Sequence, residues 1–121
     1  MNLLIVEDSM LISCLLRDLM TGLPGIGHID QAATLALALQ SVRREPPALV
    51  ILDLQLPDGN GMQIIGNLKQ LSPGLRIAML TLNAENAYRH KCLALGADWF
   101  FDKATDIDAL LRQVRLQAAL H

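Results

Sequence analysis

The sequence predicts a three-layer α/β sandwich, in which a parallel sheet of five strands is covered by five helices. The first observation is that strand-like and helix-like patterns alternate five times along the chain, as they do in βαβ units. The second is that some strand-like runs are apolar throughout, which is typical of central strands in a parallel sheet. The third is the length of 121 residues, which indicates a single domain over residues 1–121 that folds without disulfides or a structural metal.

Two of the strand-like segments, residues 3–6 and 49–52, contain only Leu, Ile and Val, and each is followed by acidic residues. Because both segments must bring carboxylates to one place, we expect them to be neighbours in the middle of the sheet. Right-handed crossovers leave two strand orders open, of which 2-1-3-4-5 suits a chain this short. The other strands are expected at residues 28–32, 76–81 and 99–103.

Five helical segments follow the strands. Ser9 is the expected N-cap of the first helix, whose apolar side is Met10, Leu11, Cys14, Leu15 and Leu19. The next three helices are expected at residues 34–44, 62–71 and 84–95, each ended by a segment rich in Pro or Gly. The fifth is expected after Thr105 as N-cap, with one apolar stripe of Ile107, Leu110, Leu111, Val114 and Ala118.

Composition excludes several classes of function. The net charge of −2 and the scattered basic residues argue against direct binding of nucleic acid by this domain. Cys14 and Cys92 lie in apolar helical patterns without a Cys-x-x-Cys motif, so we interpret them as small buried residues in a reducing compartment. The chain has no signal-peptide pattern and no apolar run near the ~18 residues of a membrane span, so we expect no membrane association and a cytoplasmic location.

Charged and hydroxyl side chains stand at the ends of successive predicted strands. Glu7 and Asp8 follow the first strand, Asp53 follows the third, Thr81 ends the fourth and Lys103 ends the fifth. The carboxyl ends of parallel strands meet at one edge of the sheet, where open α/β sheets bind their ligands. Three carboxylates at one edge require a cation, and the whole set predicts a site that accepts a phosphoryl group.

The chemistry expected of each residue follows from its type. Mg²⁺ prefers oxygen ligands, so Asp8, Asp53 and the backbone carbonyl of Gln55 are candidate ligands, with Glu7 acting through water. The carboxylate of Asp53 can attack phosphorus to form an aspartyl phosphate. Lys103 and Mg²⁺ would neutralise the charge on the transferring group, and Thr81 would donate a hydrogen bond to a phosphoryl oxygen.

The chain resembles the receiver domain of bacterial two-component response regulators over essentially its whole length. Within that family it is similar to the chemotaxis regulator. Three motifs carry the resemblance: Ile5-Val6-Glu7-Asp8-Ser9, Leu52-Asp53-Leu54-Gln55-Leu56-Pro57-Asp58-Gly59-Asn60-Gly61, and Ala94-Leu95-Gly96-Ala97-Asp98 ahead of Lys103. The resemblance implies a flavodoxin-like fold with strand order 2-1-3-4-5, Asp53 as phosphoacceptor, Glu7 and Asp8 as magnesium acids, and Lys103 as the phosphate-binding amine. It also implies that Thr81 is the signalling hydroxyl and Phe100 the aromatic switch residue.

The sequence departs from the family pattern at three positions. Many receivers have Pro directly after the Lys, often through a cis peptide, whereas Ala104 follows Lys103 here and predicts a trans bond. The residue after the Thr is commonly small, and here Leu82 could narrow the approach to Asp53. Phe100 lacks the hydroxyl with which a Tyr would form a hydrogen bond.

The expected function is that of a phosphorylation-dependent regulator and not of an enzyme beyond its own phosphotransfer and dephosphorylation. The expected partners are a sensor histidine kinase or phosphotransfer protein, which supplies the phosphoryl group, and an output effector protein or a C-terminal effector domain. A homodimer could form through the fourth helix, fifth strand and fifth helix, the surface expected to switch.

Two rival classes remain. An aspartate-nucleophile phosphatase needs a second Asp two residues after the first, where this chain has Gln55. A degenerate receiver acting as a constitutive interaction module would lack the acidic pair or the Lys, and both are present here.

Overall fold

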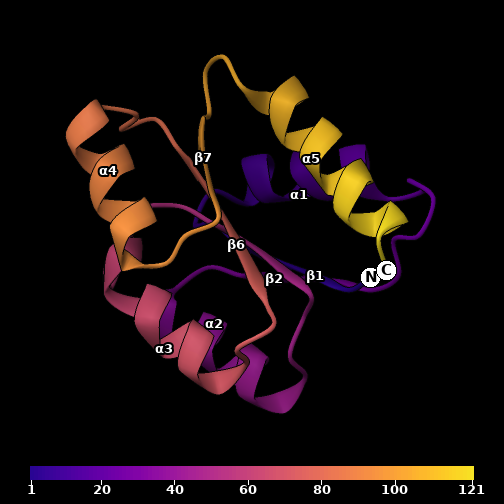
Figure 1. Ribbon diagram of the computed structural model, residues 1–121, viewed down its shortest axis with the longest axis horizontal. Coiled ribbons are helices and arrows are strands. Elements are labelled where there is room, and N and C mark those ends of the chain that lie inside the picture. The colour runs from indigo at the N-terminus through magenta and orange to yellow at the C-terminus, as the bar shows by residue number, and fades with distance from the viewer.

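The computed structural model describes all residues, 1–121, and contains the predicted three layers around a five-stranded parallel sheet (Figure 1). The sheet order is β2-β1-β3-β6-β7, which is order 2-1-3-4-5 when the five sheet strands are counted along the chain. The predicted fold class and strand order are therefore confirmed. The strands are β1 (Leu3–Val6), β2 (Ile29–Ala32), β3 (Leu49–Leu52), β6 (Arg76–Thr81) and β7 (Trp99–Asp102).

The sheet separates two apolar cores. On one face, Leu16 and Met20 of one helix and Leu110 and Val114 of another pack against the sheet. On the other face, the core draws on the remaining three helices. Figure 1 shows α1 and α5 together on one side, and α2, α3 and α4 on the other. The helices are α1 (Met10–Met20), α2 (Leu35–Arg44), α3 (Ile65–Leu71), α4 (Asn86–Leu95) and α5 (Ile107–Ala119).

The buried side of α1 differs from the predicted one. The side chains of α1 that are buried are Ser13, Leu16 and Met20, whereas Met10 and Leu11 are 71% and 78% exposed. The expected apolar side of Met10, Leu11, Cys14, Leu15 and Leu19 is thus mostly turned to solvent, and Cys14 is only half-buried. Because α1 is apolar on most of its circumference, its periodicity does not identify the side that packs on the sheet.

Two helix starts also differ from expectation. Residues Gly61–Ile64 form a turn of 3₁₀ helix before α3, and the carboxamide of Asn60 accepts the backbone N–H of Met62 at its start. The N-cap position of α5 is Asp106 and not Thr105, so the predicted cap was wrong by one residue. The predicted stripe of α5 is confirmed, because Leu110, Val114 and Ala118 are buried. The other two stripe residues, Ile107 and Leu111, are partly buried and pack against the core that contains Leu110 and Val114.

A short hairpin after β3 was not predicted. β4 (Gln55–Leu56) and β5 (Gly59–Asn60) form an antiparallel pair. The Asp58 carboxylate in its turn accepts the backbone N–H groups of Leu35 and Ala36 at 2.8 and 3.1 Å, at the start of α2. These hydrogen bonds lower the pKa of Asp58 and tie the loop that follows Asp53 to a helix end.

Candidate functional site

The acidic residues that follow β1 and β3 meet at the carboxyl edge of the sheet. Parallel pairing sets Val6 of β1 beside Leu52 of β3, so the residues after each strand are neighbours. One carboxylate oxygen from each of Glu7, Asp8 and Asp53 lies within 4.8 Å of the other two. The predicted gathering of these three carboxylates is therefore present in the structure.

These carboxylates line an open cavity of about 460 Å³. Gln55, whose carbonyl is an expected metal ligand, and Leu82, which is expected to narrow the approach to Asp53, both line this cavity. Two further wall residues, Ser9 and Ile12, were not predicted as part of the site, although Ser9 follows the acidic pair directly. The full lining is Glu7, Asp8, Ser9, Ile12, Asp53, Gln55, Leu82 and Lys103.

Lys103 reaches the acidic cluster from the end of β7. Its Nζ donates to Glu7 Oε1 and, at 2.9 Å, to Asp53 Oδ2, and its side chain is only 13% exposed. Burial alone lowers the pKa of Lys103, but the hydrogen bonds from Nζ to Glu7 and Asp53 and the attraction of both carboxylates raise it more. The net pKa is above the ordinary value, so Lys103 is a permanent cation in the cavity.

Backbone groups hold the two buried carboxylates in place. Asp53 Oδ1 accepts the N–H of Leu54 at 2.7 Å, and Glu7 Oε2 accepts the N–H of Ser9 at 3.1 Å. Asp53 and Glu7 are both buried, whereas Asp8 is exposed. With Lys103 included, three carboxylates and one ammonium leave two uncompensated negative charges at the cavity when all are ionised. This donor set of oxygens and this charge suit a hard divalent cation.

Gly61 has a structural role at the site that the sequence analysis did not identify. The N–H of Gly61 donates to the carbonyl of Leu54 at 2.7 Å, and a Cβ at this position would collide with the backbone carbonyl of Asp53. The chain after Asp53 thus folds back against the residue itself, which only Gly permits. The Asp-Gly-Asn-Gly run is a turn signal, but the contact with Asp53 depends on tertiary structure.

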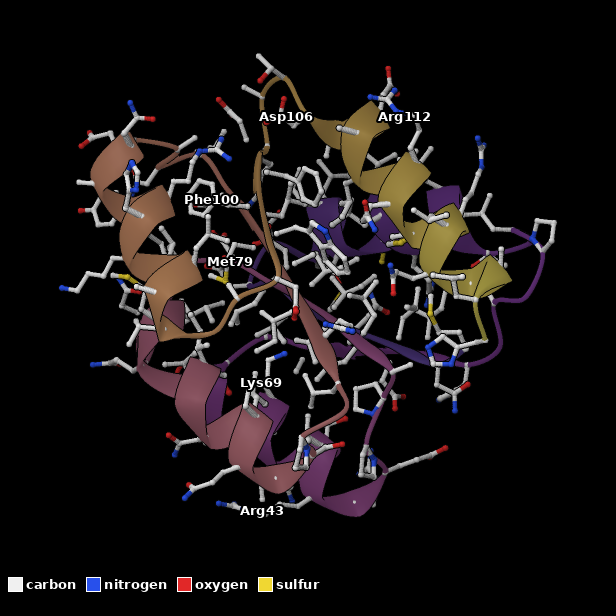
Figure 2. The ribbon with its side chains drawn as sticks, in the orientation of Figure 1. Arg43, Lys69, Met79, Phe100, Asp106 and Arg112 are labelled. Carbon is white, nitrogen blue, oxygen red and sulfur yellow. The ribbon has the colours of Figure 1, made fainter.

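The two predicted signalling residues, Thr81 and Phe100, are buried and do not line the cavity. Thr81 is buried at the end of β6, and its Oγ1 accepts the N–H of Asn83 at 3.1 Å. Phe100 is 5% exposed and packs in the core shared with Met79, its neighbour across the β6–β7 pair (Figure 2). The guanidinium carbon of Arg89 lies 5.0 Å from the Phe100 ring centroid, and Arg89 donates to the Phe100 carbonyl at 3.1 Å. Phe100 therefore points inward, covered by α4.

Comparison with known protein families identifies the family to which the chain belongs. The model of the response regulator receiver domain matches residues 3–115. The chain belongs to the response regulator receiver domain family. It is 38% identical over 120 residues to the KDP operon transcriptional regulatory protein KdpE of Escherichia coli, covering 98% of the chain and 51% of KdpE. The chain thus spans about half the length of this relative.

Solved receiver structures have the same fold. The BeF₃-activated N-terminal receiver domain of Klebsiella pneumoniae RstA aligns with a TM-score of 0.87 and 25% identity, covering 98% of each chain. A response regulator from Burkholderia pseudomallei, with a phosphorylated aspartic acid, calcium ion and citrate, aligns with a TM-score of 0.80 and 26% identity, covering 98% of this chain and 73% of that one. The chain is therefore a receiver domain of the two-component type. No helix in it has the length and apolarity needed to cross a bilayer.

Proposed function

We propose that this receiver domain takes a phosphoryl group from the phosphohistidine of a sensor histidine kinase or phosphotransfer protein onto Asp53. The observation that carries the proposal is the position of Asp53, a buried carboxylate on the wall of an open cavity, with Lys103 at 2.9 Å and two further acids beside it. A degenerate interaction module would have no reason to keep this set. A relative with a phosphorylated aspartic acid supports the same chemistry.

The transfer forms one bond and breaks one bond. An oxygen of the Asp53 carboxylate bonds to phosphorus while the phosphorus–nitrogen bond of phosphohistidine breaks, and the electron pair stays on the imidazole nitrogen. Leu54 N–H and Lys103 orient the carboxylate. Afterwards the Lys103 ammonium, no longer held by a free Asp53 carboxylate, can pair with a phosphoryl oxygen.

The acidic cluster fits Mg²⁺, for which Asp8, Asp53 and the Gln55 carbonyl are the proposed ligands and Glu7 a ligand through water. When bound, Mg²⁺ supplies positive charge against the charge that develops on the transferring group. Glu7 already accepts hydrogen bonds from Lys103 and from Ser9 N–H, which supports an indirect role for it.

Phosphorylation is proposed to change the output surface formed by α4, β7 and α5. It adds about −1.5 to −2 charges and strong acceptor oxygens beside Thr81. Thr81 would then exchange its bond with Asn83 N–H for one to the phosphoryl group, and Phe100 with α4 would respond. The proposed readers of this surface are an output effector protein, a C-terminal effector domain or a second copy in a homodimer, all in the cytoplasm.

Intact-mass spectrometry after incubation with acetyl phosphate tests the phosphorylation step. We expect one phosphate adduct in the presence of MgCl₂, none in excess EDTA and none in Asp53→Asn, which keeps the size of the side chain. An adduct of equal yield in Asp53→Asn would show that another residue is the acceptor.

A further inference from the structure

Lys103 is presented by the 102–106 loop, which runs from the last residue of β7 to the N-cap residue of α5 and in which every backbone N–H has an acceptor. Lys103 N–H donates to the carbonyl of Thr81 at 2.9 Å, and the N–H groups of Thr105 and Asp106 donate to the carbonyl of Asp102 at 3.3 and 2.8 Å. The other two acceptors are carboxylates. Asp106 Oδ2 accepts Asp102 N–H at 2.9 Å, and Asp102 Oδ1 accepts Ala104 N–H at 2.8 Å.

The carboxylate of Asp106 is turned away from its usual task. An Asp at the N-cap position normally accepts the N–H of the second or third helical residue. Asp106 occupies the N-cap position of α5 but makes no such bond, and its Oδ2 instead points back to Asp102. Figure 2 shows Asp106 at the tip of the loop between β7 and α5, ahead of the helix. The side chain thus closes the loop at the expense of capping the helix.

The loop needs such closure because of its sequence and its task. Ala104 and Thr105 are exposed, and neither has the fixed φ of a proline. The Thr105 hydroxyl donates only to Asp106 Oδ1, at 3.3 Å, so this contact too depends on the Asp106 carboxylate. Lys103 has a long side chain that must end between Glu7 and Asp53. Because a long side chain can deliver its amine accurately only from a fixed backbone, the loop conformation determines where the ammonium lies.

We propose that Asp102 and Asp106 are positioning residues, which lock the 102–106 loop and thereby hold the Lys103 ammonium between Glu7 and Asp53. The consequence for phosphotransfer rests on the proposed function of Asp53. Neither aspartate lines the cavity, so both act through Lys103.

Competitive acylation of lysine amines, read by peptide mass spectrometry, tests the placement without any phosphotransfer. In the native protein Lys103 is 13% exposed and Lys91 on α4 is exposed, so Lys103 is expected to label far more slowly than this internal reference. Asp106→Ala and Asp102→Ala are each expected to raise the Lys103 to Lys91 ratio several-fold. Asp106→Asn keeps an acceptor oxygen and is expected to keep the native ratio, as is Asp108→Ala, which removes the same charge from an exposed position.

The rate of Asp53 phosphorylation by acetyl phosphate with Mg²⁺ tests the consequence. We expect a fall of about tenfold in Asp106→Ala, because a misplaced charge partner loses most of its effect, and a near-native rate in Asp106→Asn and Asp108→Ala. An unchanged labelling ratio in folded Asp106→Ala and Asp102→Ala would overturn the lock. A native phosphorylation rate in a variant whose Lys103 has become accessible would overturn its consequence for phosphotransfer. If the wild type forms no adduct, the proposed function fails, whereas the labelling ratio still decides whether the aspartates hold Lys103.

Discussion

At the scale of single residues, the charge balance of the cavity depends on Lys103. Its ammonium is the one cation among the lining residues, and it contacts two of the three carboxylates. Under the proposed function, phosphorylation would increase the negative charge at Asp53 and bound Mg²⁺ would oppose it, so the charge of the cavity would change around the Lys103 ammonium. Residues that shape access to the cavity or hold the loops around it should therefore change rates more than they change the fold.

Leu82 is the residue expected to limit access to Asp53. Its side chain is 70% exposed and lies on the cavity wall. We expect Leu82→Ala to speed both phosphorylation by acetyl phosphate and hydrolysis of the aspartyl phosphate by about two- to fivefold, which corresponds to less than about 1 kcal/mol of activation free energy. Time courses by intact-mass spectrometry measure both rates. Leu93→Ala, on α4 and away from the cavity, is the matched control, and equal rates in the two variants would remove the steric explanation.

Asp98 carries the largest ion-pair network outside the cavity. Its carboxylate accepts Lys69 Nζ at 2.8 Å, Arg76 Nη1 at 3.0 Å and the N–H of Ile77 at 2.8 Å. We expect Asp98→Ala to lower the free energy of unfolding by about 2 kcal/mol, because it removes the acceptor of the Ile77 N–H and the ion-pair partner of Lys69 and Arg76. Lys69 keeps only its hydrogen bond to the Leu75 carbonyl. Arg76→Ala should cost less than about 1 kcal/mol, because this side chain is more than half exposed. Urea unfolding at pH 7 measures both.

The same network predicts a pH dependence. Burial raises the pKa of Asp98, but the hydrogen bonds from Lys69, Ile77 and Arg76 lower it by more than burial raises it. The net pKa of Asp98 therefore lies below its ordinary value. A lowered pKa in the folded state means that the contribution of Asp98 is complete above the unfolded value of about 3.9 and is lost as pH falls through the folded value. The stability gap between wild type and Asp98→Ala should therefore be constant from pH 5 to 7 and close only in stronger acid. A gap that already closes between pH 6 and 5 would contradict this assignment.

The residues of the site were predictable because of where they stand on the strands. An apolar run followed by a carboxylate places that carboxylate at the carboxyl edge, and this reasoning brought Glu7, Asp8, Asp53 and Lys103 together correctly. The contacts of Asp102 and Asp106 were not predictable in the same way. An Asp near a helix start can bond forward to the helix or back to the loop, and the choice depends on the loop conformation.

At the scale of elements, α1 shows how composition can conceal orientation. The helix begins at the predicted N-cap, where Ser9 Oγ accepts Ile12 N–H at 3.3 Å. Its rotation about its own axis was predicted wrongly, because apolar residues occupy almost every side of it. In the structure Ser13 marks the side of α1 that faces the sheet, since its buried hydroxyl accepts a hydrogen bond from Gln31 of β2 at 2.6 Å. A polar residue in an apolar helix thus faces the sheet.

Adjacent leucines of α1 test this orientation. Leu16 is 2% exposed in the core under α1 and α5, whereas Leu15 is 52% exposed. We expect Leu16→Ala to lower the free energy of unfolding by about 2–5 kcal/mol and Leu15→Ala by less than about 0.5 kcal/mol. Chemical denaturation of the two variants makes the comparison. A larger loss in Leu15→Ala would restore the rotation that the sequence pattern favoured and refute the observed one.

At the scale of the whole molecule, the strand order makes a single site from distant segments. Placing β1 next to β3 puts Glu7 and Asp8 beside Asp53, about 45 residues further along the chain, and β6 and β7 add Thr81 and Lys103 at the same edge. The order was predictable because the two central strands have no polar residue and both end in carboxylates. The hairpin β4–β5 was not, because its strands are two residues long and carry no periodicity.

Gathering the carboxylates also has a cost to the whole fold. The three carboxylates repel one another more in the folded chain than in the unfolded chain, where they are far apart, and the Lys103 ammonium offsets only part of this repulsion. A divalent cation that binds the folded site alone should therefore stabilise the molecule by linkage. For an assumed millimolar affinity, ~10 mM MgCl₂ adds roughly 1.4 kcal/mol to the free energy of unfolding. For a domain of this length that corresponds to a rise in melting temperature of about 4–7 °C.

Thermal unfolding followed by circular dichroism, with MgCl₂ and with NaCl of matched ionic strength, measures this rise. Asp8→Asn removes one proposed ligand from an exposed position, so it should fold normally, melt at or above the wild-type temperature without metal, and gain less from MgCl₂. Lys103→Met separates the effects of the two positive charges, the Lys103 ammonium and Mg²⁺. Because it removes the ammonium, it should make the stability depend more steeply on magnesium than in the wild type. An equal rise in wild type and Asp8→Asn would mean that magnesium acts elsewhere on the surface. If NaCl raised the melting temperature as much as MgCl₂ does, the rise would come from ionic screening of the carboxylate repulsion. The carboxylates at the sheet edge would then form a phosphorylation site that binds no specific metal.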